Sequence, residues 1–139
     1  SFGGYGAMVL ATHSDRFKAA IVNNGFADLG ALYGFGWDHF MMIAAIGARP
    51  WEDPHRYVAN SPIYQLQRLK TPLLIQVGAK DRGFNELSDH IFYAAQVLGK
   101  EATLLKYEDE GHGISGHANL QDYWQRVTEF LKVHLQGAD

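Results

Sequence analysis

Residues 71–81 read TPLLIQVGAKD, and this stretch carries the clearest strand signal in the sequence. Its middle, LLIQV at residues 73–77, consists almost entirely of large apolar side chains. A short apolar run between turn-forming residues predicts a buried strand over residues 73–77. The strand is followed by a loop that ends in Asp81, so an acidic residue is expected just beyond a strand end.

Strand and helix signals alternate on both sides of this stretch. Downstream, apolar residues recur at helical spacing over residues 87–98, a second strand pattern covers residues 103–107, and residues 120–135 trace one face of an amphipathic helix. Upstream, residues 5–12 resemble a helix buried on most sides, and residues 19–22 read as a short buried strand. This order predicts an α/β fold with a parallel sheet covered by helices on both faces.

The segment between the first two predicted strands is an insertion. Residues 26–48 are rich in glycine and aromatic side chains and show helical spacing only in their second half. Residues 49–62 follow as a connection punctuated by proline. We expect residues 1–139 to form one domain, because this length is sufficient to bury a core and no linker or repeat interrupts it.

Composition excludes several classes of protein. The chain has 139 residues, is 47% hydrophobic and 19% charged, and carries 12 basic and 15 acidic residues for a net charge of −3. No basic block of the kind found in nucleic-acid-binding proteins is present, and no apolar run is long enough to cross a membrane. The absence of cysteine excludes disulfides, thiolate zinc sites and a cysteine nucleophile, but it does not settle the compartment.

Two polar residues stand where parallel α/β sheets place their functional groups, in loops beyond the carboxyl ends of strands, and a third, Ser1, precedes the first helix. Asp81 follows the strand at residues 73–77, and His112 lies in the loop YEDEGHG after the next strand. Ser1 precedes the first helix in SFGG, which matches the second half of the G-x-S-x-G turn. The order Ser, Asp, His is that of the α/β-hydrolases.

The chemistry explains why these residue types belong together. A serine hydroxyl becomes a good nucleophile when an imidazole accepts its proton, and a carboxylate orients that imidazole and stabilises its charged form. Taken singly, Ser1 fits a flexible terminus, Asp81 a helix cap or turn, and His112 an ordinary loop residue. The fixed order of all three at predicted strand ends favours the catalytic interpretation.

Four stretches of the chain resemble the catalytic domain of the prolyl oligopeptidase family of serine peptidases, especially its dipeptidyl-peptidase and acylaminoacyl-peptidase branches. They span nearly the whole chain in the order that the family has. The stretches are SFGGYGA, DRFKAAIV, NSPIYQLQRLKTPLLIQVGAKD and LLKYEDEGHGI.

The resemblance implies the C-terminal portion of an α/β-hydrolase fold that begins at the nucleophile. It implies Ser1 as nucleophile, His112 as general base and then acid, and Asp81 as its orienting partner. The backbone N–H of Phe2 would supply one oxyanion-hole donor. One departure concerns specificity, because Gly83 stands where the dipeptidyl branch has an asparagine.

In this family the insertion helps to line the pocket for the residue that precedes the scissile bond. Aromatic side chains suit proline or other compact apolar groups. Tyr33 and Trp37, which are flanked by glycine-rich sequence, are the predicted substrate-binding residues. The alternative for any one of these rings is an ordinary place in the core.

No metal or other cofactor is predicted. The remaining histidines show neither the i, i+4 helical pair nor the carboxylate cluster that a hydrolytic zinc site requires. Asp109 and Glu110, next to the loop histidine, are interpreted as a solvated turn rather than as paired catalytic carboxylates.

The sequence therefore favours a serine peptidase that acts on short peptides through an acyl-enzyme. The alternatives are an esterase with the same three residues and a non-catalytic module. The chain has no initiator Met and begins within the serine motif, which predicts that it is part of a longer protein. The expected partners are the N-terminal remainder of the hydrolase domain, a β-propeller domain and, for the chain by itself, other copies in a homo-oligomer.

Overall fold

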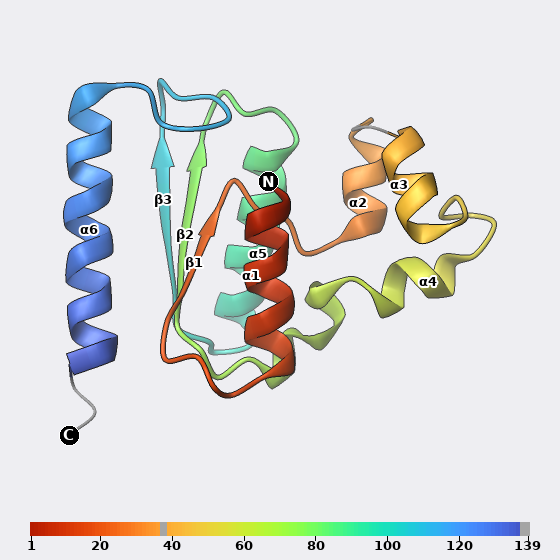
Figure 1. Cartoon of the computed structure of the whole chain (residues 1–139), viewed down its shortest axis with the longest axis horizontal. Helices are drawn as coiled ribbons and strands as arrows, with labels where there is room; N and C mark the ends of the chain where they lie inside the picture. The colour runs from red at the N-terminus through yellow and green to blue at the C-terminus, as the bar shows by residue number, and fades with distance from the viewer. Residues whose placement is uncertain (37–38, 137–139) are drawn as a thin grey trace.

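A three-stranded parallel sheet forms the centre of the computed structural model, which describes residues 1–36 and 39–136 (Figure 1). The strands are β1 (Ala20–Asn23), β2 (Leu73–Gly78) and β3 (Ala102–Tyr107), and β2 lies between the other two. Leu73 aligns with Ala20 on one side and with Ala102 on the other. The predicted α/β fold with a parallel sheet is confirmed.

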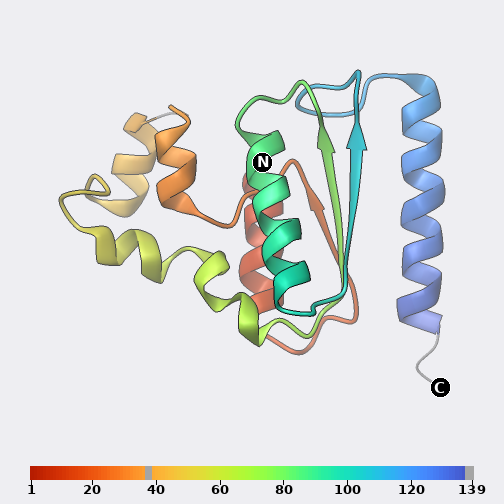
Figure 2. The same ribbon diagram turned by 180° about the vertical axis from the view of Figure 1, so that it is seen from behind.

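Helices cover both faces of the sheet, as Figures 1 and 2 show from opposite sides. α1 (Phe2–His13) and α5 (Phe84–Val97) pack on one face, where Leu73 and Ile75 of β2 belong to the buried core. α6 (His117–Gln136) covers the other face, where Leu74 packs with residues of β3 and α6. All six residues of β2 are buried, which agrees with the apolar run that predicted this strand.

The insertion between β1 and β2 is a helical lobe that projects beside α1 (Figure 1). It contains α2 (Leu29–Gly34), α3 (His39–Ile46), α4 (Pro54–Ala59) and the 3₁₀ helix η1 (Pro62–Arg68).

Two of these helices correct the sequence analysis, which expected helical structure only in the second half of residues 26–48 and none in residues 49–62. Both are one and a half turns long and depend on an aspartate cap rather than on apolar periodicity. Asp28 accepts a hydrogen bond from the N–H of Ala31 at 3.0 Å, and Asp53 accepts one from the N–H of Arg56 at 3.3 Å.

α6 is joined to the sheet by polar contacts as well as by its apolar face. The side-chain amide of Asn23, at the end of β1, contacts the Tyr123 hydroxyl with Nδ2···Oη at 2.8 Å. The Tyr107 hydroxyl donates to Asp122 Oδ2 at 2.9 Å. These contacts fix the first turns of α6 against the strand ends.

A close approach of two glycines joins α1 to the turn after β1. A Cβ added at Gly4 would lie 2.6 Å from Cα of Gly25 and 2.8 Å from the Asn23 carbonyl oxygen, too close for any side chain. Because α1 begins at Phe2, this approach sets the position of the helix N-terminus relative to β1. It explains why the serine motif continues with small residues.

We expect Gly4→Ala to lower the free energy of unfolding by about 1–3 kcal/mol, since backbone atoms must move to admit the methyl group. Gly6→Ala is the matched control in the same helix, because nothing lies within 4 Å of its added Cβ. Gly6→Ala should raise the free energy of unfolding by about 0.5–1 kcal/mol, because alanine has a higher helix propensity than glycine. Urea unfolding measures both, and a stabilising effect of Gly4→Ala would contradict the close approach.

Candidate active site

Asp81 is a buried carboxylate in the loop between β2 and α5. Asp81 comes shortly after Gly78, the last residue of β2, and is only 5% exposed. The Asp81 carbonyl oxygen accepts the N–H of Asn85 at 2.8 Å, which ties the loop to the first turn of α5. A carboxylate in this position needs hydrogen-bond donors, because burying an unpaired charge is costly.

His112 lies in the loop between β3 and α6 and supplies one of these donors. Its Nδ1 is 2.8 Å from Asp81 Oδ2. A carboxylate can only accept a hydrogen bond, so the proton of this contact is on Nδ1 and Nε2 of the neutral ring is left as the basic nitrogen. The ring also packs edge-on against Phe84, with the ring centroids 4.8 Å apart.

Ser1 stands at the N-terminus of α1, at the same end of the sheet (Figure 1). Its backbone nitrogen donates to the Asn23 carbonyl oxygen at 3.0 Å, so the end of β1 fixes its position. Ser1 is exposed, and within the described residues its hydroxyl makes no capping hydrogen bond to the helix. Phe84 lines one cavity together with Ser1, and its ring packs against His112.

A small apolar cavity of about 120 Å³ opens beside Ser1. Its lining comes from the start of α1, the insertion and α5, and Phe26 in this lining is completely buried. The lining residues other than Ser1 are Phe2, Phe26, Leu32, Met41, Met42 and Phe84. The cavity is well below the roughly 300–1,000 Å³ of a site for a drug-sized ligand, and it is suited to a single side chain.

Tyr33, which the sequence analysis predicted to bind substrate, is not among the residues that line this cavity. It is 7% exposed and stacks on His39 with ring centroids 4.2 Å apart. Its ring also meets Tyr57 edge-on within the core of the lobe. Trp37 lies outside the described residues, so its predicted role is untested. The consecutive residues Met41 and Met42 of α3 also line the cavity, and the sequence analysis did not single them out.

Glu110 holds the loop that carries His112, and this corrects its interpretation as part of a solvated turn. The residue is 2% exposed. Its carboxylate accepts hydrogen bonds from the Ser115 N–H, the Gly116 N–H and the Asn119 side chain at 2.7–2.8 Å, and from the Ser115 hydroxyl at 2.9 Å. These donors lower the pKa of Glu110 to about 2. Its neighbour Asp109 is exposed, as expected for a solvated turn.

The same loop rests directly on the end of β2. A Cβ added at Gly78 would clash with the carbonyl oxygens of Glu110 and Gly111, so only glycine permits this approach. The N–H of Lys80 donates to the Glu110 carbonyl oxygen at 2.9 Å. The loops that carry Asp81 and His112 are therefore joined through their backbones as well as through the two side chains.

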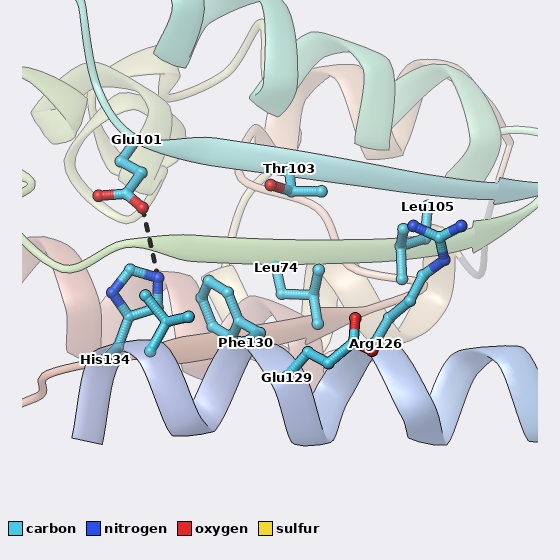
Figure 3. Close-up of a pocket in the computed structure, with 9 residues that line it drawn as sticks. Leu74, Glu101, Thr103, Leu105, Arg126, Glu129, Phe130 and His134 are labelled. Atoms are coloured by element: carbon cyan, nitrogen blue, oxygen red, sulfur yellow. Dashed lines mark ion pairs between the residues drawn. The ribbon is translucent and has the colours of Figure 1, made fainter. Parts of the chain in front are cut away.

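A second hollow, of about 250 Å³, lies between α6 and the β3 side of the sheet (Figure 3). Glu101, the residue before β3, pairs there with His134 of α6, with His134 Nε2 and Glu101 Oε1 3.3 Å apart. This pair is at the amino end of β3, whereas Ser1, Asp81 and His112 lie at the carboxyl ends of the strands. None of these three residues is among the described residues that line the hollow.

Residues 1–36 and 39–136 contain neither a cluster of metal ligands nor a membrane-spanning helix. No group of three or more His, Asp or Glu side chains in this part of the chain is placed to hold a metal ion. No helix among the same residues is both long and apolar enough to cross a membrane.

Comparison with known proteins identifies the family. A profile of the prolyl oligopeptidase family matches residues 1–138. The chain belongs to this family of serine-type peptidases. Its resemblance to the family in four stretches of sequence is thereby confirmed over nearly the whole chain.

Curated members of the prolyl oligopeptidase family are much longer than this chain. Dipeptidyl-peptidase 5 of Porphyromonas gingivalis is 33% identical over 122 residues, which cover 82% of the chain and 18% of that protein. The uncharacterized peptidase YuxL of Bacillus subtilis is 27% identical over 140 residues, which cover 97% of the chain and 21% of that protein. The chain thus spans about one fifth of the length of these relatives.

Solved structures of peptidases share the fold. The acylaminoacyl peptidase of Pyrococcus horikoshii superimposes with a TM-score of 0.88 at 26% identity, over 100% of the chain and 23% of that protein. A puromycin-hydrolyzing peptidase of Mycobacterium tuberculosis gives a TM-score of 0.88 at 24% identity, over 97% of the chain and 21% of that protein. The chain therefore has the architecture of part of an α/β-hydrolase peptidase.

The low pKa of Glu110 predicts a specific loss of stability in acid. The unfolded chain takes up a proton on this group near its ordinary pKa, whereas the folded chain does so only near pH 2, so acid favours unfolding between these values. Glu110→Gln should lower the melting temperature at neutral pH, and its difference from the wild type should narrow from about pH 4.5 to about pH 2. Thermal melts over this range measure the difference.

Asp109→Asn is the control for this measurement. Asp109 is the adjacent acidic residue, is exposed and contacts Lys80 at 3.3 Å at the surface. Its substitution should leave the acid branch of the stability curve close to that of the wild type. A Glu110→Gln curve parallel to the wild type down to pH 2 would show that the folded carboxylate is not held in its charged form.

Proposed function

We propose that this chain supplies the nucleophile, the general base and the orienting carboxylate of a serine peptidase. The observation that carries the proposal is the hydrogen bond between His112 Nδ1 and the buried Asp81 Oδ2, at the end of the sheet where Ser1 opens α1. This pairing leaves the basic Nε2 for the serine proton. Membership in a family of serine-type peptidases supports the same assignment.

The proposed reaction has two halves that use the same residues. Ser1 Oγ attacks the carbonyl carbon of the peptide bond while its proton passes to Nε2 of His112, and that proton then goes to the leaving amine as the C–N bond breaks. A water molecule attacks the resulting acyl-serine ester and gives its proton to Nε2. The acid product leaves when this proton returns to Ser1 Oγ. Asp81 keeps the ring oriented and stabilises the imidazolium in both halves.

The oxyanion of each tetrahedral intermediate requires hydrogen-bond donors. Phe2 is the first residue of α1, so its N–H is one of the helix groups that no intrahelical carbonyl accepts. The positive end of the helix dipole lies at the same place and favours a developing negative charge. We assign the Phe2 N–H as one oxyanion donor.

The cavity beside Ser1 is the proposed site for the side chain that precedes the scissile bond. Apart from Ser1, its walls are aromatic, leucine and methionine side chains, so a charged group entering it would lose its hydration without gaining an oppositely charged side chain among the described lining residues. We therefore propose short peptides with an apolar residue before the cleaved bond as substrates. The remainder of the hydrolase domain and a β-propeller domain are the proposed partners within a longer protein.

The first test is labelling with a fluorophosphonate, which reacts with an activated serine. We expect the label on Ser1, and we expect His112→Ala to slow labelling about a hundred-fold or more, because the general base is lost. Mass spectrometry of the labelled peptide locates the site. The experiment is best done on the longest natural polypeptide that contains this sequence.

Two variants serve as controls for this labelling. Ser1→Ala should abolish the label, and His117→Ala should leave the rate unchanged, because His117 is an exposed histidine at the start of α6. Equal rates in His112→Ala and His117→Ala would contradict the role of His112 as base. Labelling without hydrolysis of amide substrates, together with rapid hydrolysis of esters, would favour an esterase instead.

Substrate preference tests the cavity separately from the triad. Met41 is 53% exposed although it lines the cavity, so its side chain can be shortened without opening the core. Met41→Ala should raise kcat/KM for substrates with phenylalanine before the scissile bond, relative to alanine, by about ten-fold. Met41→Leu, which conserves volume, is the control. Aminoacyl p-nitroanilides measure the ratio of kcat/KM for phenylalanine and alanine substrates. An unchanged ratio in Met41→Ala would show that the cavity does not bind this side chain of the substrate.

A further inference from the structure

The turn that follows β1, residues 23–25, contacts all three segments that carry the proposed catalytic residues. Its first residue accepts the Ser1 backbone nitrogen at 3.0 Å. Its second, Asn24, donates through Nδ2 to Asp81 Oδ2 at 2.7 Å and to the Gly111 carbonyl oxygen, next to His112 in sequence, at 3.5 Å. No role in the site was assigned to this turn from the sequence.

The backbone of Asn24 is held in an uncommon conformation. Its φ is +44°, and among the described residues it is the only non-glycine residue with a positive φ. Asparagine tolerates this left-handed region better than most residues. Asn24 is 4% exposed, and its N–H donates to the Gln76 carbonyl oxygen at 2.8 Å, in continuation of the β1–β2 pairing. The direction in which its side chain leaves the backbone is therefore fixed.

The side-chain amide and the histidine share one carboxylate oxygen. Asp81 Oδ2 accepts from Asn24 Nδ2 at 2.7 Å and from His112 Nδ1 at 2.8 Å. Two donors that approach one oxygen from separate elements restrict rotation of the carboxylate about its Cβ–Cγ bond. A hydrogen bond to a buried ionised group is also stronger than one between neutral groups.

We propose that Asn24 is a positioning residue, whose side-chain amide keeps Asp81 Oδ2 directed at His112 Nδ1. This inference rests on the proposed function for the roles of the aspartate and the histidine. The competing explanation is that asparagine occurs here only because the turn needs a positive φ. The two explanations differ in whether the amide N–H itself is required.

Two substitutions separate the amide from the backbone conformation. Asn24→Gly removes the side chain but adopts a positive φ without strain. Asn24→Asp keeps the size of the side chain but replaces the N–H donor with a second acceptor, which faces Asp81 Oδ2. Gln125→Glu is the control for the amide-to-carboxylate change, because Gln125 is exposed on α6.

The readouts are the far-downfield proton resonance of the His112 Nδ1–H···Asp81 hydrogen bond, assigned through its absence in His112→Ala, and the fluorophosphonate labelling rate at Ser1. We expect both Asn24 variants to lose or shift the resonance and to label about ten-fold more slowly. Gln125→Glu should match the wild type in both. Circular dichroism tests whether each variant is folded. If Asn24→Gly does not fold, Asn24→Asp alone tests whether the amide N–H is required.

An Asn24→Gly protein with the wild-type resonance and labelling rate would overturn the inference, since the backbone alone would then suffice. Absence of the resonance in the wild type would overturn it as well, because the hydrogen bond to be positioned would not exist. A wild type that shows the resonance but does not label at Ser1 would refute the proposed function only. In that case, loss of the resonance in the Asn24 variants would still support the positioning role.

Discussion

The fold depends on the burial of β2. This strand pairs on both sides and is covered on both faces, so its backbone and side chains are removed from water along its whole length. A parallel arrangement then brings the carboxyl ends of all three strands to one edge of the sheet. The segments that leave this edge carry residues far apart in the sequence. Their meeting is a consequence of strand direction and does not require any affinity between the segments themselves.

What fixes the geometry at this edge is the cost of burying charge. Two carboxylates, Asp81 and Glu110, are almost completely removed from solvent. Asp81 accepts hydrogen bonds from two other loops, and Glu110 accepts them from residues 115–119. Burying either carboxylate without a partner would destabilise the fold by far more than a surface ion pair stabilises it. The loops that carry them therefore have few alternative conformations. Pairing within the site and order in the loops are the same physical requirement.

Much of this arrangement could be predicted because its signals are local. The apolar run at residues 73–77 identifies the central strand, and strand ends followed by Asp81 and His112 indicate their common location. Their hydrogen bond joins residues that are far apart in the sequence, but the order of strands and helices predicts that the two side chains meet. The family match over residues 1–138 includes these stretches.

The remainder depended on contacts that a linear pattern does not contain. Glu110 lies in a run of acidic residues that resembles a solvated turn, and its donors come from residues 115–119. Tyr33 is as aromatic as a pocket residue, but packing against His39 and Tyr57 places it in the core of the lobe. The caps Asp28 and Asp53 were visible in the sequence, and capping signals weighed more heavily would have predicted α2 and α4.

The insertion between β1 and β2 has a consequence for how such a protein can diversify. Leu32, Met41 and Met42 of the insertion line the cavity, whereas the hydrogen bonds of Asn24 and His112 to Asp81 lie at the sheet edge. Under the proposed function, mutations in α2 and α3 would alter which side chain the cavity accepts without replacing the residues that transfer the proton. Selectivity would then be encoded in the insertion and reactivity at the sheet edge, so libraries confined to α2 and α3 would change the first separately from the second.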